Sequence, residues 1–120
     1  MGAEAIVDRQ LAAYNAKDLE AFLACYAPTA ELFELPGQSL ASGTAALRER
    51  YQQRFADPLL HATIANRIVI GDKVIDHEQI RRTWPEGPGT WEVVAIYEVE
   101  AGLIARTWFI LGAKQLDPTR

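Results

Sequence analysis

The stretch "YNAKDLEAFLACYAPTAELFE", Tyr14 to Glu34, joins a helical pattern of apolar residues to an alternating one. Apolar side chains first recur at the i, i+3, i+4, i+7 spacing of a single helix face, at Leu19, Phe22, Leu23 and Tyr26. Asp18 in front of them is a preferred N-cap residue, and Pro28 behind them ends a helix. Residues 30–35 then predict a strand, which the turn residues Pro36-Gly37 close.

Glu34 is the unusual residue of this strand, because its neighbours are apolar. Successive strand residues point to opposite faces, so Ala30, Leu32 and Glu34 share one side. If that side faces the core, a carboxylate is carried into apolar surroundings, which is costly unless the group is paired, hydrated or used in chemistry. The alternative is that Glu34 lies at the end of the strand and reaches solvent.

Two further helices flank this stretch. In residues 3–16 the apolar side chains near one side are Ile6, Val7, Leu11 and Tyr14. Thr44 is a candidate cap for a third helix to about Ala56, whose apolar face is formed by Leu47, Tyr51 and Phe55. Asp57-Pro58 stops that helix. The first half of the chain is therefore predicted to hold three helices, with one strand between the second and the third.

The second half of the chain predicts strands joined by hairpins. Gly71-Asp72 is suited to a two-residue hairpin turn, in which glycine takes the positive φ of a type II′ turn. Such a turn fixes the register of the strands on either side. Asn66 then faces His77 on the side that carries the isoleucines, and Arg67 faces Asp76 on the other side. We therefore expect His77 and Asn66 to point inward and the Arg67–Asp76 pair to be exposed.

A second hairpin is predicted around "EAG", Glu100 to Gly102, as a three-residue turn with glycine in the left-handed position. In this register Ala95 faces Thr107 and Val93 faces Phe109. These four residues would lie on the face that covers the core.

The opposite face of the same hairpin, residues 90–99 and 103–111, is also apolar, at Val94, Ile96, Trp108 and Ile110. An exposed apolar patch of this kind usually marks an interface. We therefore predict a homodimer joined through this outer sheet face. The alternative is that a terminal segment covers it.

Composition limits the class of protein. The chain has 120 residues, 49% hydrophobic and 23% charged, as expected for one soluble globular domain over residues 1–120. Its formal net charge of −4 argues against nucleic acid or an anionic membrane as partner, because phosphate binding needs clustered Lys and Arg. No apolar run approaches the ~20 residues that span a bilayer. Residues 1–10 lack the apolar segment of a signal peptide, so a cytoplasmic location is expected.

Metal and thiol chemistry are not indicated. Cys25, the single cysteine, lies in an apolar helical pattern, which favours a small buried filler over a reactive thiol. His61 and His77 are expected on opposite sides of the sheet with no cysteine nearby, so we predict no metal site and no cofactor. The run "RRTWPEGPGTW", residues 81–91, either rims a cavity or touches a partner subunit.

Four segments resemble the nuclear transport factor 2-like superfamily, and within it the SnoaL-like and ketosteroid isomerase-like branch. Tyr14–Glu34 is similar to the family's helix–helix–strand signature, and "SGTAALRERY", Ser42 to Tyr51, is similar to its glycine-led third helix. "NRIVIGDKVIDHE", Asn66 to Glu78, and "VVAIYEVEAGLIARTWFI", Val93 to Ile110, are similar to its hairpins. The resemblance covers nearly the whole chain. It implies a single SnoaL-like domain with an α+β, cystatin-like fold: a cone-shaped, barrel-like curved mixed sheet wrapped around three N-terminal helices.

The same resemblance implies a candidate site. Glu34 falls where the ketosteroid isomerases keep their aspartate general base, and Tyr26 and Tyr51 fall on two tyrosines of that site's hydrogen-bond network. The two groups that stabilise the enolate oxygen in those enzymes fall on Gln10 and Ala95, so both proton donors are missing. An isomerase needs those donors as much as its base. This departure argues against a true ketosteroid isomerase.

Two functions follow from these patterns. In the first, Glu34 projects into a cavity between helices and sheet and acts as a catalytic base, with His77 as its catalytic partner. Substrate contacts are then expected from Gln10, Tyr14, Tyr26, Tyr51, Asn66 and Phe109. The chemistry would be cofactor-free acid–base catalysis on a hydrophobic small molecule, of isomerase, cyclase or hydratase type. In the second, these groups are structural, and the protein is a non-catalytic small-molecule-binding protein or dimeric scaffold.

Overall fold

The computed structural model describes residues 2–118 as three helices and six strands. The helices are α1 (Ala3–Ala16), α2 (Leu19–Leu23) and α3 (Gly43–Phe55). The strands are β1 (Tyr26–Glu34), β2 (Gln38–Ser42), β3 (His61–Ile70), β4 (Lys73–Trp84), β5 (Gly87–Glu100) and β6 (Leu103–Leu116). No helix within residues 2–118 has the length and apolarity needed to cross a membrane.

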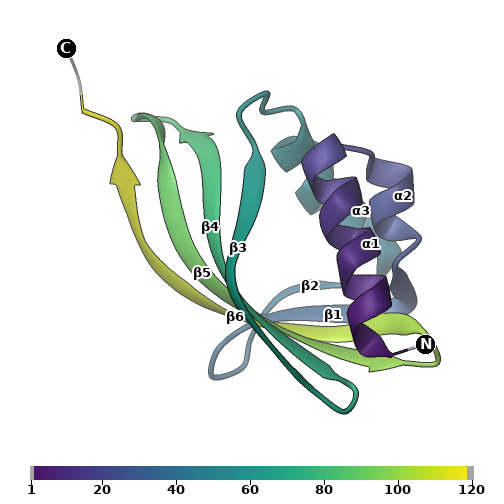
Figure 1. The fold of residues 1–120 in the computed structure, drawn as a ribbon. Coiled ribbons are helices and arrows are strands. Elements are labelled where there is room, and N and C mark those ends of the chain that lie inside the picture. The colour runs from purple at the N-terminus through teal and green to yellow at the C-terminus, as the bar shows by residue number, and fades with distance from the viewer. Residues whose placement is uncertain (1, 119–120) are drawn as a thin grey trace.

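The strands of this region form one sheet, in the order β2-β1-β6-β5-β4-β3. β1 runs parallel to β6 and the other neighbouring strands are antiparallel, so the sheet is mixed. The sheet bends strongly, and the helices lie on its concave side (Figure 1). The α+β fold with a curved mixed sheet around N-terminal helices is therefore confirmed.

The first two helices follow the predicted pattern with one difference. α1 has the predicted bounds, and Asp18 caps α2 by accepting a hydrogen bond from the backbone N–H of Ala21 at 3.1 Å. α2 ends earlier than predicted, at Leu23, and Tyr26 already begins β1. The Tyr26 side chain is buried in either case, so its place in the apolar pattern reflects burial and not helix.

β2 and the start of α3 are less visible in the sequence. β2 is an edge strand of mostly exposed side chains, paired with β1 on one side, so it carries no apolar alternation. Ser42 occupies the N-cap position of α3 without a side-chain hydrogen bond. Thr44, the predicted cap, lies within the helix, and its hydroxyl donates to the carbonyl of Pro28 at 3.4 Å.

The β3–β4 hairpin has the predicted register close to its turn. Asn66 pairs with His77, and Arg67 pairs with Asp76. A β-bulge at Ala65 then interrupts the pairing and adds one residue to β3. Because side chains alternate with a period of two, one extra residue exchanges the faces on which the residues after it lie.

This bulge makes the predicted inward placement of His77 and Asn66 wrong. The prediction assumes that side chains alternate between the two faces without interruption through residues 60–70. In the structure, the extra residue Ala65 places the side chains after it on the opposite face from the one predicted. The buried side chains of β4 are Val74, Asp76 and Glu78. The face of β4 that faces the helices is therefore the one predicted to be exposed, and the Arg67–Asp76 pair lies on it.

The β5–β6 turn is tighter than predicted. Glu100 pairs with Leu103, which leaves a two-residue turn of Ala101 and Gly102 at φ values of 52° and 79°. A register shift follows in the strands, and Phe109 pairs with Ala95 instead of Val93. The displacement is two residues, so the division into inner and outer faces remains as predicted.

Aromatic rings and two polar links hold the helices against the sheet. Phe22 of α2 is fully buried, with its ring centroid 5.0 Å from that of Tyr26 on β1, and such pairs add about 0.5–1.5 kcal/mol to area burial. Cys25 is buried, as predicted. The Asn15 side chain exchanges hydrogen bonds of 3.0 and 2.8 Å with the backbone of Ala62 on β3. These contacts place α1 across the inner face of β3 and β4.

Candidate functional site

A small internal cavity lies between the helices and the concave face of the sheet. Its polar lining comes from α1, α3, β4 and β5, and consists of Gln10, Tyr14, Arg50, Tyr51, Arg54, Glu78 and Tyr97. Its apolar lining includes Trp91, Val93 and Phe109. Its volume is about 40 Å³, room for a few water molecules, whereas pockets for organic ligands are typically about 300–1,000 Å³. Entry of an organic ligand therefore requires lining side chains to move.

Glu78 is the carboxyl group of this cavity. It projects from the inner face of β4 and is 5% exposed. Burial, and then the neighbouring charge of Asp76, raise the pKa of Glu78 from 4.5 to about 8, against the opposing effect of Arg67. At neutral pH the carboxyl group is mostly protonated, so it can donate a proton or, once ionised, accept one.

Asp76 lies two residues earlier on the same face and is 1% exposed. Its two carboxylate oxygens accept hydrogen bonds from Nε and Nη2 of Arg67, at 2.6 and 2.9 Å. Arg67 also reaches Glu4, at 3.3 Å, and Asp8 on α1. Glu78 forms no ion pair within residues 2–118. The fold thus neutralises one inner carboxylate of β4 and leaves the other to carry a proton.

Tyrosine hydroxyls surround Glu78. Burial raises the pKa of Tyr14, Tyr26, Tyr51 and Tyr97, and the charge of Glu78 contributes to the rise in each. These phenols therefore remain neutral and can act as hydrogen-bond donors or acceptors to a ligand. Gln10 donates from Nε2 to the hydroxyl of Tyr26 at 3.4 Å, both side chains being buried.

Four of the six predicted substrate contacts line this cavity: Gln10, Tyr14, Tyr51 and Phe109. Tyr26 touches it indirectly, through its hydrogen bond with Gln10. Asn66 does not, because it lies on the outer face of β3. Whether any of these residues contacts a substrate stays a prediction.

Glu34 is the last residue of β1 and is partly exposed. It shares the inner face with the buried residues Ala30 and Leu32, as the alternation predicts. It pairs along the backbone with Phe109 of β6, but it is not among the residues that line the inner cavity. Its position agrees with the strand-end alternative, and its predicted role as catalytic base stays a prediction.

His77 lies on the outer face of the sheet, where its Nε2 is 2.6 Å from a carboxylate oxygen of Glu92 on β5. It lines an open groove of about 370 Å³ together with Asn66, Ile68, Ile75, Val94 and Ile110. The prediction that Glu34 and His77 share one interior cavity is therefore wrong. The bulge at Ala65 is the cause.

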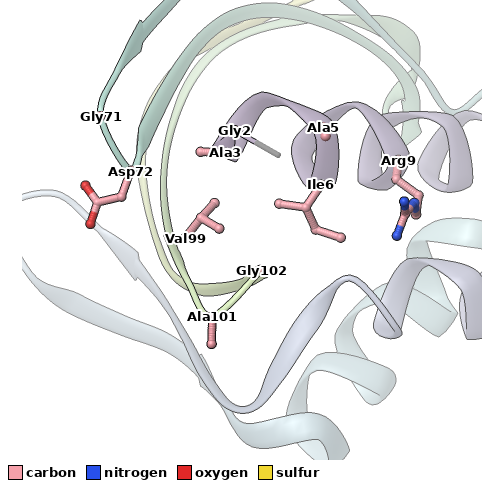
Figure 2. A pocket seen from close by; sticks show the side chains of 10 residues that line it. All are labelled: Gly2, Ala3, Ala5, Ile6, Arg9, Gly71, Asp72, Val99, Ala101 and Gly102. Atoms are coloured by element: carbon pink, nitrogen blue, oxygen red, sulfur yellow. The ribbon is translucent and has the colours of Figure 1, made fainter.

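A wider depression lies at the far end of the molecule, between the N-terminus of α1 and the two hairpin turns (Figure 2). Its volume is about 480 Å³. Ile6 and Val99 point into it, whereas the Asp72 carboxylate points away, towards its ion pair with Lys73 at 2.8 Å. Its lining holds no buried acid or base, whereas that of the smaller inner cavity includes the buried carboxyl group of Glu78.

Three arginines stand at the edge of the inner cavity. Arg50 and Arg54 of α3 line the cavity itself, and Arg54 also lines a surface hollow with Arg82 of β4. The guanidinium carbon of Arg82 lies 5.0 Å from the ring centroid of Trp84 and 5.6 Å from that of Trp91. Of the two alternatives left open for the segment 81–91, the cavity rim is the one this geometry favours.

Asp76 and Glu78 are the buried carboxyl groups of the candidate site that sequence reasoning missed. The signal was present, because both alternate with the apolar residues Val74 and Ile80 in β4. It was outweighed by the isoleucines on the opposite side, which indicated that the other face was buried. Within residues 2–118, no group of three or more His, Cys, Asp or Glu side chains is arranged to hold a metal ion.

Solved structures with this fold are known from several bacteria. An uncharacterised cystatin-fold protein from Novosphingobium aromaticivorans is 25% identical, with a TM-score of 0.83 over 92% of this chain and 98% of that one. SalBIII, an epoxide hydrolase/cyclase-like enzyme of pyran ring formation in the polyether salinomycin, is 16% identical, with a TM-score of 0.81 over 92% of this chain and 90% of that one. A hypothetical protein with a ketosteroid isomerase-like fold from Catenulispora acidiphila, in complex with trimethylamine, is 16% identical, with a TM-score of 0.73 over 87% and 82% of the two chains.

No curated protein sequence matches the chain significantly. The family comparison is positive, because the model of the SnoaL-like domain matches residues 7–107, most of the described chain. That range contains both buried carboxyl groups of β4 and every tyrosine of the inner cavity. The chain therefore belongs to the SnoaL-like domain family.

Proposed function

We propose that this protein binds a small, largely apolar molecule in its inner cavity and catalyses cofactor-free proton transfer on it, with Glu78 as the proton-carrying group. The observation that carries the proposal is a buried carboxyl group, without an ion pair in residues 2–118, whose pKa is about 8. General acid–base catalysis is most effective when the pKa of the catalytic group lies near the working pH. Isomerisation, cyclisation and hydration are reactions that such a group can accelerate.

The surroundings of Glu78 support the same chemistry. Neutral tyrosines and the Gln10 amide supply hydrogen bonds to an oxygen of the ligand, while Trp91, Val93 and Phe109 supply apolar contacts. A few convergent polar groups in an apolar cavity are typical of small-molecule sites. SalBIII, whose fold is similar, is described as an epoxide hydrolase/cyclase-like enzyme, which makes ring-forming or ring-opening substrates a sensible first choice.

The test compares Glu78 with Glu34, the carboxyl group at the end of β1. Wild type, Glu78→Gln and Glu34→Gln are screened against enones, epoxides and polyketide-like substrates by mass spectrometry. We expect Glu78→Gln to lose about 10²–10⁴-fold in rate, and Glu34→Gln to stay within a few-fold of wild type. The reverse result would assign the base to Glu34 and overturn the proposal.

A non-catalytic binding protein is the second candidate, because the tyrosines and the Gln10 amide that line the cavity can hold a ligand without transferring a proton to it. It predicts that a ligand raises the melting temperature without being converted. The two candidates can be distinguished by incubating a bound ligand with the protein in D₂O. A proton-transfer enzyme would exchange the acidic hydrogens of the ligand for deuterium, whereas a binding protein would not.

We also propose that two copies meet through the outer sheet face. Trp108 and Phe33 stack there with ring centroids 5.8 Å apart, and Ile110 beside them is 49% exposed. Ile68, 47% exposed, extends the patch along β3. Burying these side chains against a second copy would stabilise the dimer by about 25 cal/mol for each Å² of apolar surface removed from water.

A further inference from the structure

The rim of the inner cavity brings three cations together without ion-pair partners. Arg50 and Arg54 lie four residues apart on α3, one helical turn, and Arg82 reaches the same region from β4. In residues 2–118 none of the three has a carboxylate oxygen within 4.0 Å, whereas Arg48, Arg67, Arg81 and Arg106 each do. Of the arginines without an ion pair in residues 2–118, Arg9 lies at the far depression, whereas Arg50, Arg54 and Arg82 lie together, in a chain whose net charge is −4.

None of the acids nearest to the cluster forms an ion pair with it in residues 2–118. Asp57 accepts hydrogen bonds from the backbone N–H and hydroxyl of Thr83, at 2.6 and 3.1 Å, and from the backbone of Leu59. Glu49 shares a surface hollow with Arg50 and Arg54 but forms no ion pair with either. Glu78, inside the cavity, is mostly protonated at neutral pH because its pKa is about 8.

Holding these guanidinium groups together is unfavourable for the empty protein. Burial lowers the pKa of Arg54, and repulsion from Arg82 and then Arg50 lowers it further. Arg82 is partly fixed by its position over the rings of Trp84 and Trp91. Arginine forks bind carboxylate and phosphate oxygens in pairs, so an anion on the rim would relieve the repulsion.

We propose that Arg50, Arg54 and Arg82 form an anion-binding site at the mouth of the inner cavity, and that the ligand is a small organic carboxylic acid. Its carboxylate lies among the three guanidinium groups, and its apolar body passes between Trp91 and Phe109 towards Glu78. This inference rests on the proposed function, and it specifies the substrate class. An inorganic anion lacks the apolar body that the walls of the cavity would contact.

The test uses crotonate, a short unsaturated acid, against crotonamide, its uncharged isostere, and against inorganic phosphate. Binding is followed by titration calorimetry and by melting temperature at constant ionic strength. We expect crotonate to bind at least tenfold more tightly than either crotonamide or phosphate. Equal binding of crotonate and crotonamide, or equal binding of phosphate and crotonate, would overturn the proposal.

Variants then locate the site. Arg54→Gln, Arg50→Gln and Arg82→Gln are each expected to weaken crotonate binding at least tenfold, with Arg54→Lys intermediate. Arg48→Gln is the matched control on the same helix, because Arg48 is paired with Glu20 at the surface, and it should bind as wild type does. Three separate arginine variants keep the test valid if one of them fails to fold, as checked by circular dichroism. Loss of binding in Arg48→Gln as well would contradict the assignment.

Glu78→Gln separates this inference from the proposed function. The anion site predicts that crotonate binding by Glu78→Gln still depends on the three arginines, whereas the proposed function predicts that this variant loses proton exchange. Arginine-dependent binding without any proton exchange would leave the anion site standing and remove the catalytic proposal. Turnover of neutral enones without crotonate binding would support the catalytic proposal and overturn the anion site.

Discussion

Asp76 and Glu78 point from the same face of β4, two residues apart, yet Arg67 binds both oxygens of Asp76, and Glu78 has no ion pair within the described chain. Two buried carboxylates so close together cannot both remain ionised at low cost. The fold meets this constraint by giving one of them a cation and the other a proton. This asymmetry underlies the first two predictions.

Stability should fall as pH rises from about 5 to 8. The pKa of Glu78 is raised to about 8 in the folded protein from an ordinary value of 4.5. Across that range the unfolded chain releases the proton of residue 78 while the folded protein keeps it, so the free energy of unfolding decreases, by on the order of 4 kcal/mol. Glu78→Gln should reduce this slope, as measured by urea unfolding at several pH values. An unchanged slope in Glu78→Gln would contradict the raised pKa.

Arg67→Gln should be strongly destabilising, by about 3–5 kcal/mol, because it leaves the buried Asp76 carboxylate without its cation. Arg106→Gln is the matched control, because Arg106 pairs with Glu98 and with the exposed Glu100 nearer the surface. Such pairs contribute about 0–1 kcal/mol. Urea unfolding of the two variants at pH 7 measures the difference. Similar losses in both would mean that burial of Asp76 does not matter.

Thr107→Val should stabilise the protein by about 1 kcal/mol. In residues 2–118, the hydroxyl of Thr107 is the buried side-chain oxygen that lacks a hydrogen-bond partner, and an unsatisfied buried polar group costs about 1–3 kcal/mol. Valine keeps the shape and removes the hydroxyl. Thr63→Val, at an exposed position of β3, should change the melting temperature little. A drop in melting temperature for Thr107→Val would indicate a hydrogen bond that the structure lacks.

Ile110→Glu should convert a dimer to a monomer. Ile110 lies on the outer sheet face and is 49% exposed, so a charge there would be buried without a partner in the dimer. Size-exclusion chromatography with light scattering at micromolar concentration measures the mass. Leu59→Glu, 41% exposed in the segment before β3, should remain dimeric. A monomeric wild type would remove the dimer proposal altogether.

Much of the fold could be predicted because its signals are local. The apolar spacing of α1, the cap at Asp18 and the turn at Gly71-Asp72 each depend on a few adjacent residues, and each agrees with the structure. The early end of α2 could not be predicted, because Tyr26 is apolar and buried whether it lies in a helix or a strand.

The candidate site was harder to predict because it depends on which face of a strand is buried. The bulge at Ala65 leaves no clear mark in the sequence, and it reverses the faces on which Asn66 and Arg67 lie. With the faces exchanged, the sequence predicts His77 in the interior and Asp76 at the exterior, whereas the structure has the reverse. The predicted face of Glu34 is correct, but the alternation of side chains along a strand does not tell how far a residue lies from a cavity.

The bulge at Ala65 also ties the length of β3 to the charge balance of the core. Because of that one additional residue, the guanidinium of Arg67 is directed at Asp76 and α1, and Ile68 is directed at the exterior. Deleting one residue between Ala62 and Arg67 would let the strand run without the bulge, and the even spacing would keep Arg67 on the inner face, opposite Asp76. Loss of the bulge at unchanged strand length would instead turn Arg67 to the outer face, and would therefore be equivalent to a charge mutation in the interior, although it changes no charged residue.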